Sequence, residues 1–213
     1  MTMSKRMLAV FLAAVPMLAG CPAARYMAYL FFGGQEKTVK AEFPGLAGKS
    51  VVVVVFCDKR TQYDYPDITL TLAAAIAGEL ERNVKKIRVI DPRQVVKYQD
   101  SNIYWDEMGK TELGRGLGAD FVLFVPVEEF NTRETGSQNL YRGRITSQCG
   151  LWQVSLPEQK ARVWQGETIR VVYPEHDPTG LLQENDRVVR DKTERLFANR
   201  LAKKFYDHKV SLE

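Results

Sequence analysis

The run Ser50–Asp58, SVVVVVFCD, constrains the fold more than any other part of this chain. Its five consecutive valines are β-branched, and the run is too short to be a core helix. A strand with apolar residues at every position is typical of a sheet that is covered on both faces. We therefore expect a fully buried strand at the centre of an α/β domain.

Helical and strand-like segments alternate after this strand. The predicted elements are, in chain order, a helix at Asp67–Ile87, a strand at Ile87–Ile90, a helix at Asp91–Gln99, a helix at Asp106–Leu117 and a buried strand at Ala119–Phe130. Asp91 is expected to cap its helix, with Pro92 at the first helical position. This order predicts parallel strands joined by right-handed crossovers.

The pattern changes after the segment Asn131–Asn139, which we expect to be a hairpin tip. Residues Tyr141–Val154 alternate between an apolar face and a face that meets water, and Ala161–Tyr173 follows as a further strand after a turn. A closing helix is predicted at Val189–Phe205, and basic residues up to Lys209 suit its negative end. The predicted fold class is α/β: a two-layer or three-layer mixed sheet with a parallel βαβ first half, an antiparallel meander and a C-terminal helix.

The amino-terminal residues have the charge and hydropathy order of a secretory signal. Lys5 and Arg6 precede the apolar run Met7–Leu18, which is too short to span a bilayer. The run closes on Leu18-Ala19-Gly20-Cys21, which resembles the lipobox of bacterial lipoprotein precursors. The alternative is an ordinary signal peptide, or a buried core segment, with an incidental cysteine.

The lipobox divides the chain into three predicted parts. Residues 1–20 are a lipoprotein signal peptide, residues 21–49 a lipidated tether and connector, and residues 50–213 a single α/β domain. Cys21 would carry diacylglycerol and palmitate-like acyl chains, which anchor the protein to a membrane without spanning it. The aromatic segment Tyr26–Phe32 either lies among the headgroups or packs on the domain. Pro22 is not the aspartate typical of inner-membrane retention, so the periplasmic face of the outer membrane is favoured.

Charge and cysteine content limit the possible partners. Without Lys5 and Arg6 the chain carries 28 basic and 26 acidic residues, because the total is 30 basic residues. This near balance gives no case for nucleic acid as a partner. Cys57 and Cys149 either form a disulfide or remain free thiols in the core.

Motifs for catalysis, cofactors or metals are not recognisable in the sequence. The glycines of LGRGLGAD, Leu113–Asp120, close a helix and lead into a strand, whereas a dinucleotide fingerprint follows a strand and opens a helix. A Cys-His nucleophile would have to use Cys57 or Cys149 with His176 or His208, and Cys57, which ends a buried strand, has no glycine elbow beside it. His176 and Asp177 have no further ligand at metal-binding spacing, so a proline-rich turn explains them better. We expect no catalytic residue, no cofactor and no metal.

Two surfaces are candidates for partner binding. The loop Asp58–Asp67 follows the first strand at the edge where open α/β sheets bind ligands, and it offers Asp58, Arg60, Tyr63 and Tyr65. The alternative for this loop is a solvated connector. Arg142 and Arg144, with Trp152 and Trp164, form the second candidate. Their alternative is arginines extended over a half-buried sheet face, with the tryptophans in the core.

An ordered set of segments carries a resemblance to known proteins. The segments are VVVVVFCD, LAAAIAGELER, VIDPRQVVKY, LGRGLGADFVLFVPVEEF, YRGRITSQCGLWQV and ARVWQGE, which together cover Ser50–Arg170. They resemble bacterial envelope lipoproteins and related domains, namely the curli-secretion lipoprotein, the penicillin-binding-protein activator lipoprotein and the amino-terminal domain of the Tol translocation protein. The resemblance implies a domain that works by docking, and it carries over no catalytic residue.

Two departures from these relatives narrow the expectation. The curli lipoprotein builds a membrane barrel from long hairpins, whereas Phe130–Tyr141 is short and polar. The activator has a long tether, whereas Gln35–Lys49 is brief. The leading hypothesis is a non-enzymatic, lipid-anchored periplasmic docking or assembly lipoprotein that binds envelope proteins. One alternative is an envelope hydrolase that uses the loop after the first strand. The other is a subunit of an oligomeric secretion assembly. A homo-oligomer is also possible under the leading hypothesis.

Overall fold

The computed structural model describes residues 36–137, 139–176, 180–182 and 184–211. The predicted signal peptide, Cys21, the segment Tyr26–Phe32 and Asp177 lie outside the described residues. The described chain forms two compact units. Strands β1 (Glu36–Val39) and β9 (His208–Ser211) make up one unit, and Lys40–Asp207 make up the other.

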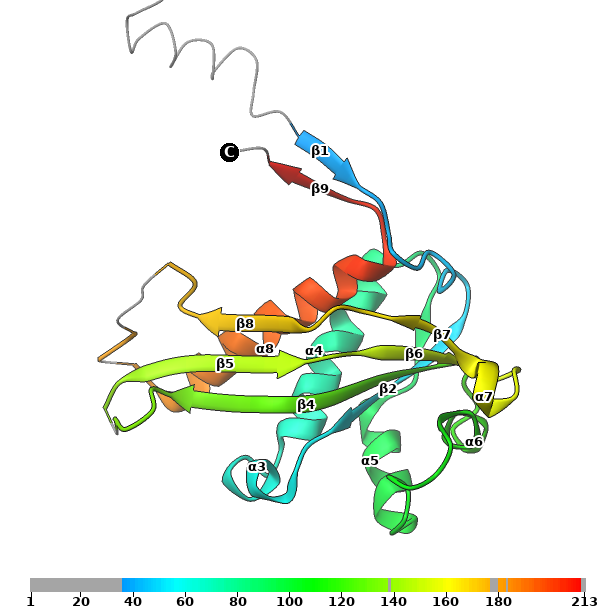
Figure 1. Cartoon of the computed structure of the whole chain (residues 1–213), viewed down its shortest axis with the longest axis horizontal. Helices are drawn as coiled ribbons and strands as arrows, with labels where there is room; N and C mark the ends of the chain where they lie inside the picture. The colour runs from blue at the N-terminus through cyan, green and yellow to red at the C-terminus, as the bar shows by residue number, and fades with distance from the viewer. Residues whose placement is uncertain (1–35, 138, 177–179, 183, 212–213) are drawn as a thin grey trace, which may run out of the picture. The chain divides into compact units, whose positions relative to one another are not determined.

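A seven-stranded mixed sheet forms the centre of the larger unit (Figure 1). Its strands are β2 (Ser50–Phe56), β3 (Arg88–Val89), β4 (Phe121–Arg133), β5 (Tyr141–Ser147), β6 (Gly150–Gln153), β7 (Arg162–Gln165) and β8 (Ile169–Tyr173). The main order is β3-β2-β4-β5-β8, and β6 pairs with both β4 and β7. The β2–β3 and β2–β4 pairs are parallel and all other pairs of this sheet are antiparallel, as the sequence predicts.

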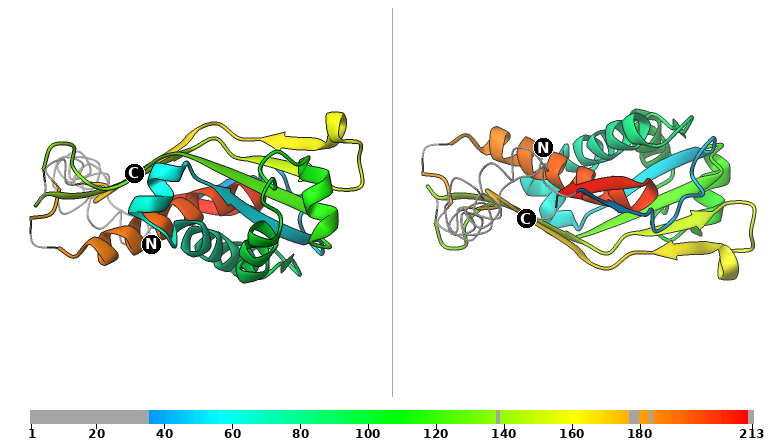
Figure 2. Two further views of the ribbon diagram at one scale, coloured as in Figure 1. Left: turned by 90° about the horizontal axis from the view of Figure 1, so that it is seen from below. Right: turned by 90° about the horizontal axis from the view of Figure 1, so that it is seen from above.

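Helices cover both faces of the parallel part of the sheet. The helices are α3 (Lys59–Asp64), α4 (Ile68–Asn83), α5 (Pro92–Ser101), α6 (Lys110–Gly116), α7 (Glu158–Ala161), α8 (Asp186–Ala202) and the 3₁₀ helix η1 (Lys203–Phe205). Helices α4 and α8 lie on the same side of the sheet (Figure 2). None of the helices in the described ranges is long and apolar enough to cross a bilayer.

The valine run of β2 contributes to two hydrophobic cores at once. Val51, Val53 and Val55 pack with buried residues of α4 and α8, whereas Val52 and Val54 pack with buried residues of α5 and α6. Alternate side chains of a strand point to opposite faces, so a strand between two helical layers must be apolar throughout. The predicted α/β class with a mixed sheet and a C-terminal helix is confirmed, and the parallel part has three layers.

The sequence predicts one continuous strand over Tyr141–Val154, and this prediction is wrong. The structure has two strands there, β5 and β6. Strand β5 pairs with the second half of β4, and β6 pairs with its first half. The break lies opposite Val125 and Pro126 of β4, next to a register shift between Val127 and Glu129 where a bulge bends the strand. The outer strand is divided in the same way, into β7 and β8.

Three predictions of local structure need correction. The segment expected to be a loop after β2 contains the helix α3, because Asp58 caps a short helical turn there. Helix α6 begins at Lys110 instead of Asp106. At this start the carboxylate of Glu158 accepts hydrogen bonds from the backbone N–H groups of Lys110 and Thr111, both at 2.9 Å. Lys209 is not at a helix end, since it lies in β9.

The smaller unit is an antiparallel ribbon of β1 and β9. Its register pairs Glu36 with Ser211 and Val39 with His208. The stretch predicted as a connector, Gln35–Lys49, therefore contains a strand. In the larger unit this stretch also supplies Leu46, which is fully buried in the core beside α4.

Candidate functional site

Asp58 holds the turn that follows β2. Its carboxylate accepts hydrogen bonds from the backbone N–H of Thr61 at 2.8 Å and from the Thr61 hydroxyl at 3.0 Å. These bonds, the backbone one foremost, keep the pKa of Asp58 below its ordinary value. The Asp58 side chain is thus engaged as the N-cap of α3.

Tyr65 packs into the domain. Its hydroxyl lies 2.9 Å from the Thr132 hydroxyl, and its ring meets Phe130 edge to face with centroids 4.7 Å apart. Tyr63, two residues earlier, is 86 % exposed, and Arg60 is exposed as well. Of the four residues predicted in this segment, Arg60 and Tyr63 are the two that present their side chains to solvent without a structural role in the turn.

The loop between α5 and α6 adds apolar residues at the same end of β2. Trp105 in this loop meets Phe56, the last residue of β2, edge to face with centroids 6.1 Å apart. Its neighbours Ile103 and Tyr104 are 83 % and 70 % exposed. We call the exposed residues at this end of the strand the β2-end surface, and they are Arg60, Tyr63, Ile103 and Tyr104.

Tyrosine and arginine are enriched among the residues that dominate the binding energy of protein–protein contacts. Ile103 and Tyr104 are not among the partner-binding residues predicted from the sequence. The available signal was two large apolar residues in a short stretch between two predicted helices, where no helix or strand periodicity explains them.

Arg142 and Arg144 meet on one carboxylate across the β4–β5 hairpin. Glu134 accepts from Arg144 Nη2 at 2.6 Å and from Arg142 Nη1 at 3.3 Å. The hydrogen bond from Arg144 is the main reason that the pKa of Glu134 is lowered. Both arginines thus bind Glu134 within the hairpin, and their role in partner binding stays a prediction.

The two tryptophans of that candidate are half-buried packing residues. Trp152 contacts Phe124 with ring centroids 6.1 Å apart, and Trp164 contacts Phe205 with centroids 4.9 Å apart. The indole nitrogen of Trp164 also donates to Glu42 at 3.1 Å. These contacts support the interpretation of Trp152 and Trp164 as parts of the folded domain.

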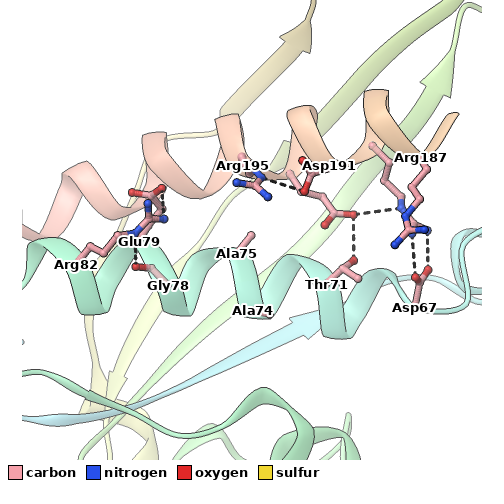
Figure 3. Close-up of a pocket in the computed structure, with 12 residues that line it drawn as sticks. Asp67, Thr71, Ala74, Ala75, Gly78, Glu79, Arg82, Arg187, Asp191 and Arg195 are labelled. Atoms are coloured by element: carbon pink, nitrogen blue, oxygen red, sulfur yellow. Dashed lines mark hydrogen bonds and ion pairs between the residues drawn. The ribbon is translucent and has the colours of Figure 1, made fainter. Parts of the chain in front are cut away.

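A groove of about 390 Å³ runs along the seam between α4 and α8 (Figure 3). Arg190 binds both carboxylate oxygens of Asp67, at 2.6 and 2.9 Å. Glu194 is 4 % exposed and accepts from the Thr71 hydroxyl at 3.0 Å. Burial, followed by the nearby Asp67 and Asp191 carboxylates, raises the pKa of Glu194 to about 7.

Two further ion pairs along this groove each join neighbouring turns of one helix. Arg82 binds Glu79 at 2.7 Å, and Arg195 binds Asp191 at 2.9 Å (Figure 3). The contacts that join the α4 side of the groove to α8 are therefore the Arg190–Asp67 ion pair and the hydrogen bond from Thr71 to Glu194.

Both cysteines of the domain are buried free thiols. Burial raises the pKa of Cys57 and of Cys149 to about 12, so neither is a thiolate near neutral pH. The disulfide left open by the sequence is not formed. In the part of the chain that the structure describes, no group of three or more His, Cys, Asp or Glu side chains is placed to hold a metal.

The glycines of LGRGLGAD lie in the last turns of α6 and directly after it. Gly118 has φ +67°, which suits the residue after a helix, and a Cβ on Gly114 would come within 2.7 Å of Val122. These glycines allow α6 to approach β4 closely. The interpretation of helix ending and strand approach is supported over a phosphate cradle.

Comparisons with known proteins give similar folds at low identity. No family model matches the chain, and no curated protein does. A PelC dodecamer from Paraburkholderia phytofirmans is 17 % identical with a TM-score of 0.47, covering 79 % of this chain and 97 % of that one. Lipoprotein GNA1162 from Neisseria meningitidis is 16 % identical with a TM-score of 0.40, covering 58 % and 79 %.

The LpoB C-terminal domain from Salmonella enterica is 18 % identical with a TM-score of 0.32, covering 61 % of this chain and 87 % of that one. No residue role, partner or activity follows from likenesses at these scores.

Proposed function

We propose that this chain is a non-catalytic, lipid-anchored protein of the bacterial cell envelope that docks envelope proteins through the β2-end surface. The sequence Leu18-Ala19-Gly20-Cys21 carries the proposal, since it joins a short apolar signal to a cysteine able to receive diacylglycerol. Exposed Tyr63, Ile103 and Tyr104 support a docking role, because they are large side chains left uncovered in the domain.

The geometry after β2 favours docking over hydrolysis. A hydrolase at this position would need Cys57 as a nucleophile or Asp58 as a general base. Cys57 has a pKa of about 12 and is 1 % exposed, and the carboxylate of Asp58 is engaged by Thr61. Neither group is prepared for proton transfer or nucleophilic attack.

The membrane assignment within this proposal follows from Pro22. Aspartate after the lipidated cysteine is typical of inner-membrane retention in enteric bacteria, and proline stands there instead. We place the protein on the periplasmic face of the outer membrane. Mass spectrometry of the mature amino terminus tests the anchor: a diacylglyceryl cysteine at Cys21 is expected, and an unmodified Cys21 in a chain that keeps Met1 contradicts the proposal.

Site-specific crosslinking tests the docking surface. A photoreactive phenylalanine analogue at Tyr63 or Tyr104 is expected to give crosslinked products with a separate envelope protein. The same analogue at Glu167, an exposed residue between β7 and β8, is the matched control and is expected to give none. Products of twice the chain's own mass indicate a homo-oligomer instead, and equal yields at all three positions contradict a specific surface.

A further inference from the structure

The β1–β9 ribbon has two different faces. Directly opposite residues of an antiparallel pair share a face, so the register places Lys37, Val39, His208 and Val210 on one side. We call this side the valine face. The other side carries Glu36, Thr38, Lys209 and Ser211, and there the Lys209 ammonium binds the Glu36 carboxylate at 2.7 Å.

The valine face exposes apolar groups. Val39 is 37 % exposed and Val210 is 42 % exposed, although valine is among the residues most often buried. Both charged residues of the opposite face are in one ion pair, whereas the valine face carries the cationic Lys37 and no carboxylate. The ribbon is thus apolar and basic on one face and polar and neutralised on the other.

The position of this ribbon in the chain points to a lipid surface. Strand β1 begins 15 residues after Cys21, and a fully extended chain of this length reaches at most about 50 Å. Strand β1 is the first element after the proposed anchor that the structure describes. Strand β9 pairs with it through backbone hydrogen bonds. An anchored Cys21 holds the ribbon at a high effective concentration near the leaflet, so a weak contact suffices.

We propose that the valine face of the ribbon lies on the phosphate-bearing headgroups of the leaflet that holds Cys21. Val39 and Val210 enter the interface, and the Lys37 ammonium lies near the lipid phosphates. This inference rests on the proposed lipid anchor. It adds that the ribbon is a second membrane contact, which orients the tether.

Depth measurements on the lipidated full-length chain test this proposal. A fluorophore sensitive to polarity is attached at one position at a time, in the variants Val39→Cys, Val210→Cys, Thr38→Cys and Ser211→Cys. The protein is inserted in vesicles of phosphatidylethanolamine and phosphatidylglycerol that contain lipids spin-labelled at the headgroup. Cys57 and Cys149 are 1 % and 0 % exposed, so they stay unlabelled in the folded protein.

We expect quenching at positions 39 and 210 to exceed that at positions 38 and 211 at least twofold, because neighbouring residues of one strand face opposite ways. A second substitution, Lys37→Glu, should reduce the quenching at position 210. Equal quenching at all four positions, in a chain whose lipidation is verified by mass spectrometry, overturns the ribbon contact and leaves the anchor intact. An unmodified Cys21 overturns the anchor, and the ribbon contact with it.

Discussion

The Thr71 hydroxyl of α4 donates a hydrogen bond to the Glu194 carboxylate of α8, with the two oxygens 3.0 Å apart. Arg190 approaches the same carboxylate only to 3.8 Å, because both of its terminal nitrogens bind Asp67. One hydroxyl and a distant guanidinium compensate poorly for the burial of a negative charge. The seam between α4 and α8 therefore favours the protonated form of Glu194.

Replacing Glu194 with glutamine should remove a pH dependence of stability. The pKa of Glu194 is raised from 4.5 to about 7, so the folded state binds a proton that the unfolded state has lost. The free energy of unfolding should therefore fall as pH rises from about 4.5 to about 7 and then level off. The shift corresponds to at most about 3 kcal/mol. Urea unfolding of E194Q across this range should lack the fall, and above pH 7 E194Q should be the more stable protein.

The control for this prediction is Glu112→Gln, on the exposed side of α6. This variant should keep the same decrease in stability with pH as the unsubstituted chain. If E194Q also keeps it, Glu194 is not the group that titrates.

A second prediction concerns the close approach of β5 and α8. Gly143 faces Thr193, and a Cβ on Gly143 would lie 2.9 Å from the Thr193 Cβ and closer still to its hydroxyl. Gly143→Ala should therefore lower the free energy of unfolding by about 1–3 kcal/mol, as overpacking does. Gly78→Ala is the matched control in a helix, because the nearest neighbour of its Cβ would be the Arg82 side chain, at 3.9 Å. That variant should be unchanged or up to about 1 kcal/mol more stable.

The two domain cysteines should not react with alkylating agents in the folded protein. Both thiols are buried and have a pKa of about 12, so almost none of either is thiolate at pH 8. Mass spectrometry after iodoacetamide treatment should show no modification of Cys57 or Cys149 in buffer and modification of both in urea. Rapid modification of Cys57 in buffer would instead support a reactive site at the end of β2.

The parts of the fold that could be predicted are those whose signals are local. The valines of β2 predict burial on two faces, because only a covered sheet accepts apolar residues at every position of a strand. Asp91 accepts a hydrogen bond from the backbone N–H of Arg93 at 2.9 Å, and Pro92 begins α5, as their order predicts. Capping and β-branching act within a few residues, so a single sequence contains them.

The parts that could not be predicted depend on distant residues. Strands β1 and β9 pair residues 36 and 211, and each strand has only four residues that are mostly exposed. Without a buried face no hydrophobic period marks them. The start of α6 could not be predicted for the same reason. The carboxylate that binds its first backbone N–H groups belongs to Glu158, which lies 48 residues after Lys110.

In the candidate site, the sequence does not predict which side chains are exposed. Tyr63 and Tyr65 are two residues apart in one segment, and the sequence offers both equally as partner-binding residues. Tyr65 bonds to Thr132 and packs on Phe130, both on β4, while Tyr63 has 86 % of its surface exposed. The rotation of the six-residue helix α3 about its axis decides which tyrosine side chain packs on the domain. The sequence of the segment does not show this rotation.

The last prediction concerns the junction where β2 and β4 begin. Asp120 accepts from the backbone N–H and the hydroxyl of Ser50, both at 2.8 Å, and its own N–H donates to the Ser50 hydroxyl at 2.9 Å. The backbone N–H of Ser50 is the main reason that the pKa of Asp120 is below its ordinary value. The contribution of this charge to stability is therefore present at neutral pH and is lost as pH falls through that lowered pKa.

Asp120→Asn should lower the free energy of unfolding at pH 7 by about 1 kcal/mol, since the charged hydrogen bonds are partly screened by solvent. The difference from the unsubstituted chain should shrink at a pH below the lowered pKa of Asp120, where the aspartate carries a proton. Asp100→Asn, at an exposed position of α5, is the control and should leave stability unchanged at both pH values. Urea unfolding at the two pH values decides the point: a loss as large at the acid pH as at pH 7 would mean that Asp120 acts through its shape rather than its charge.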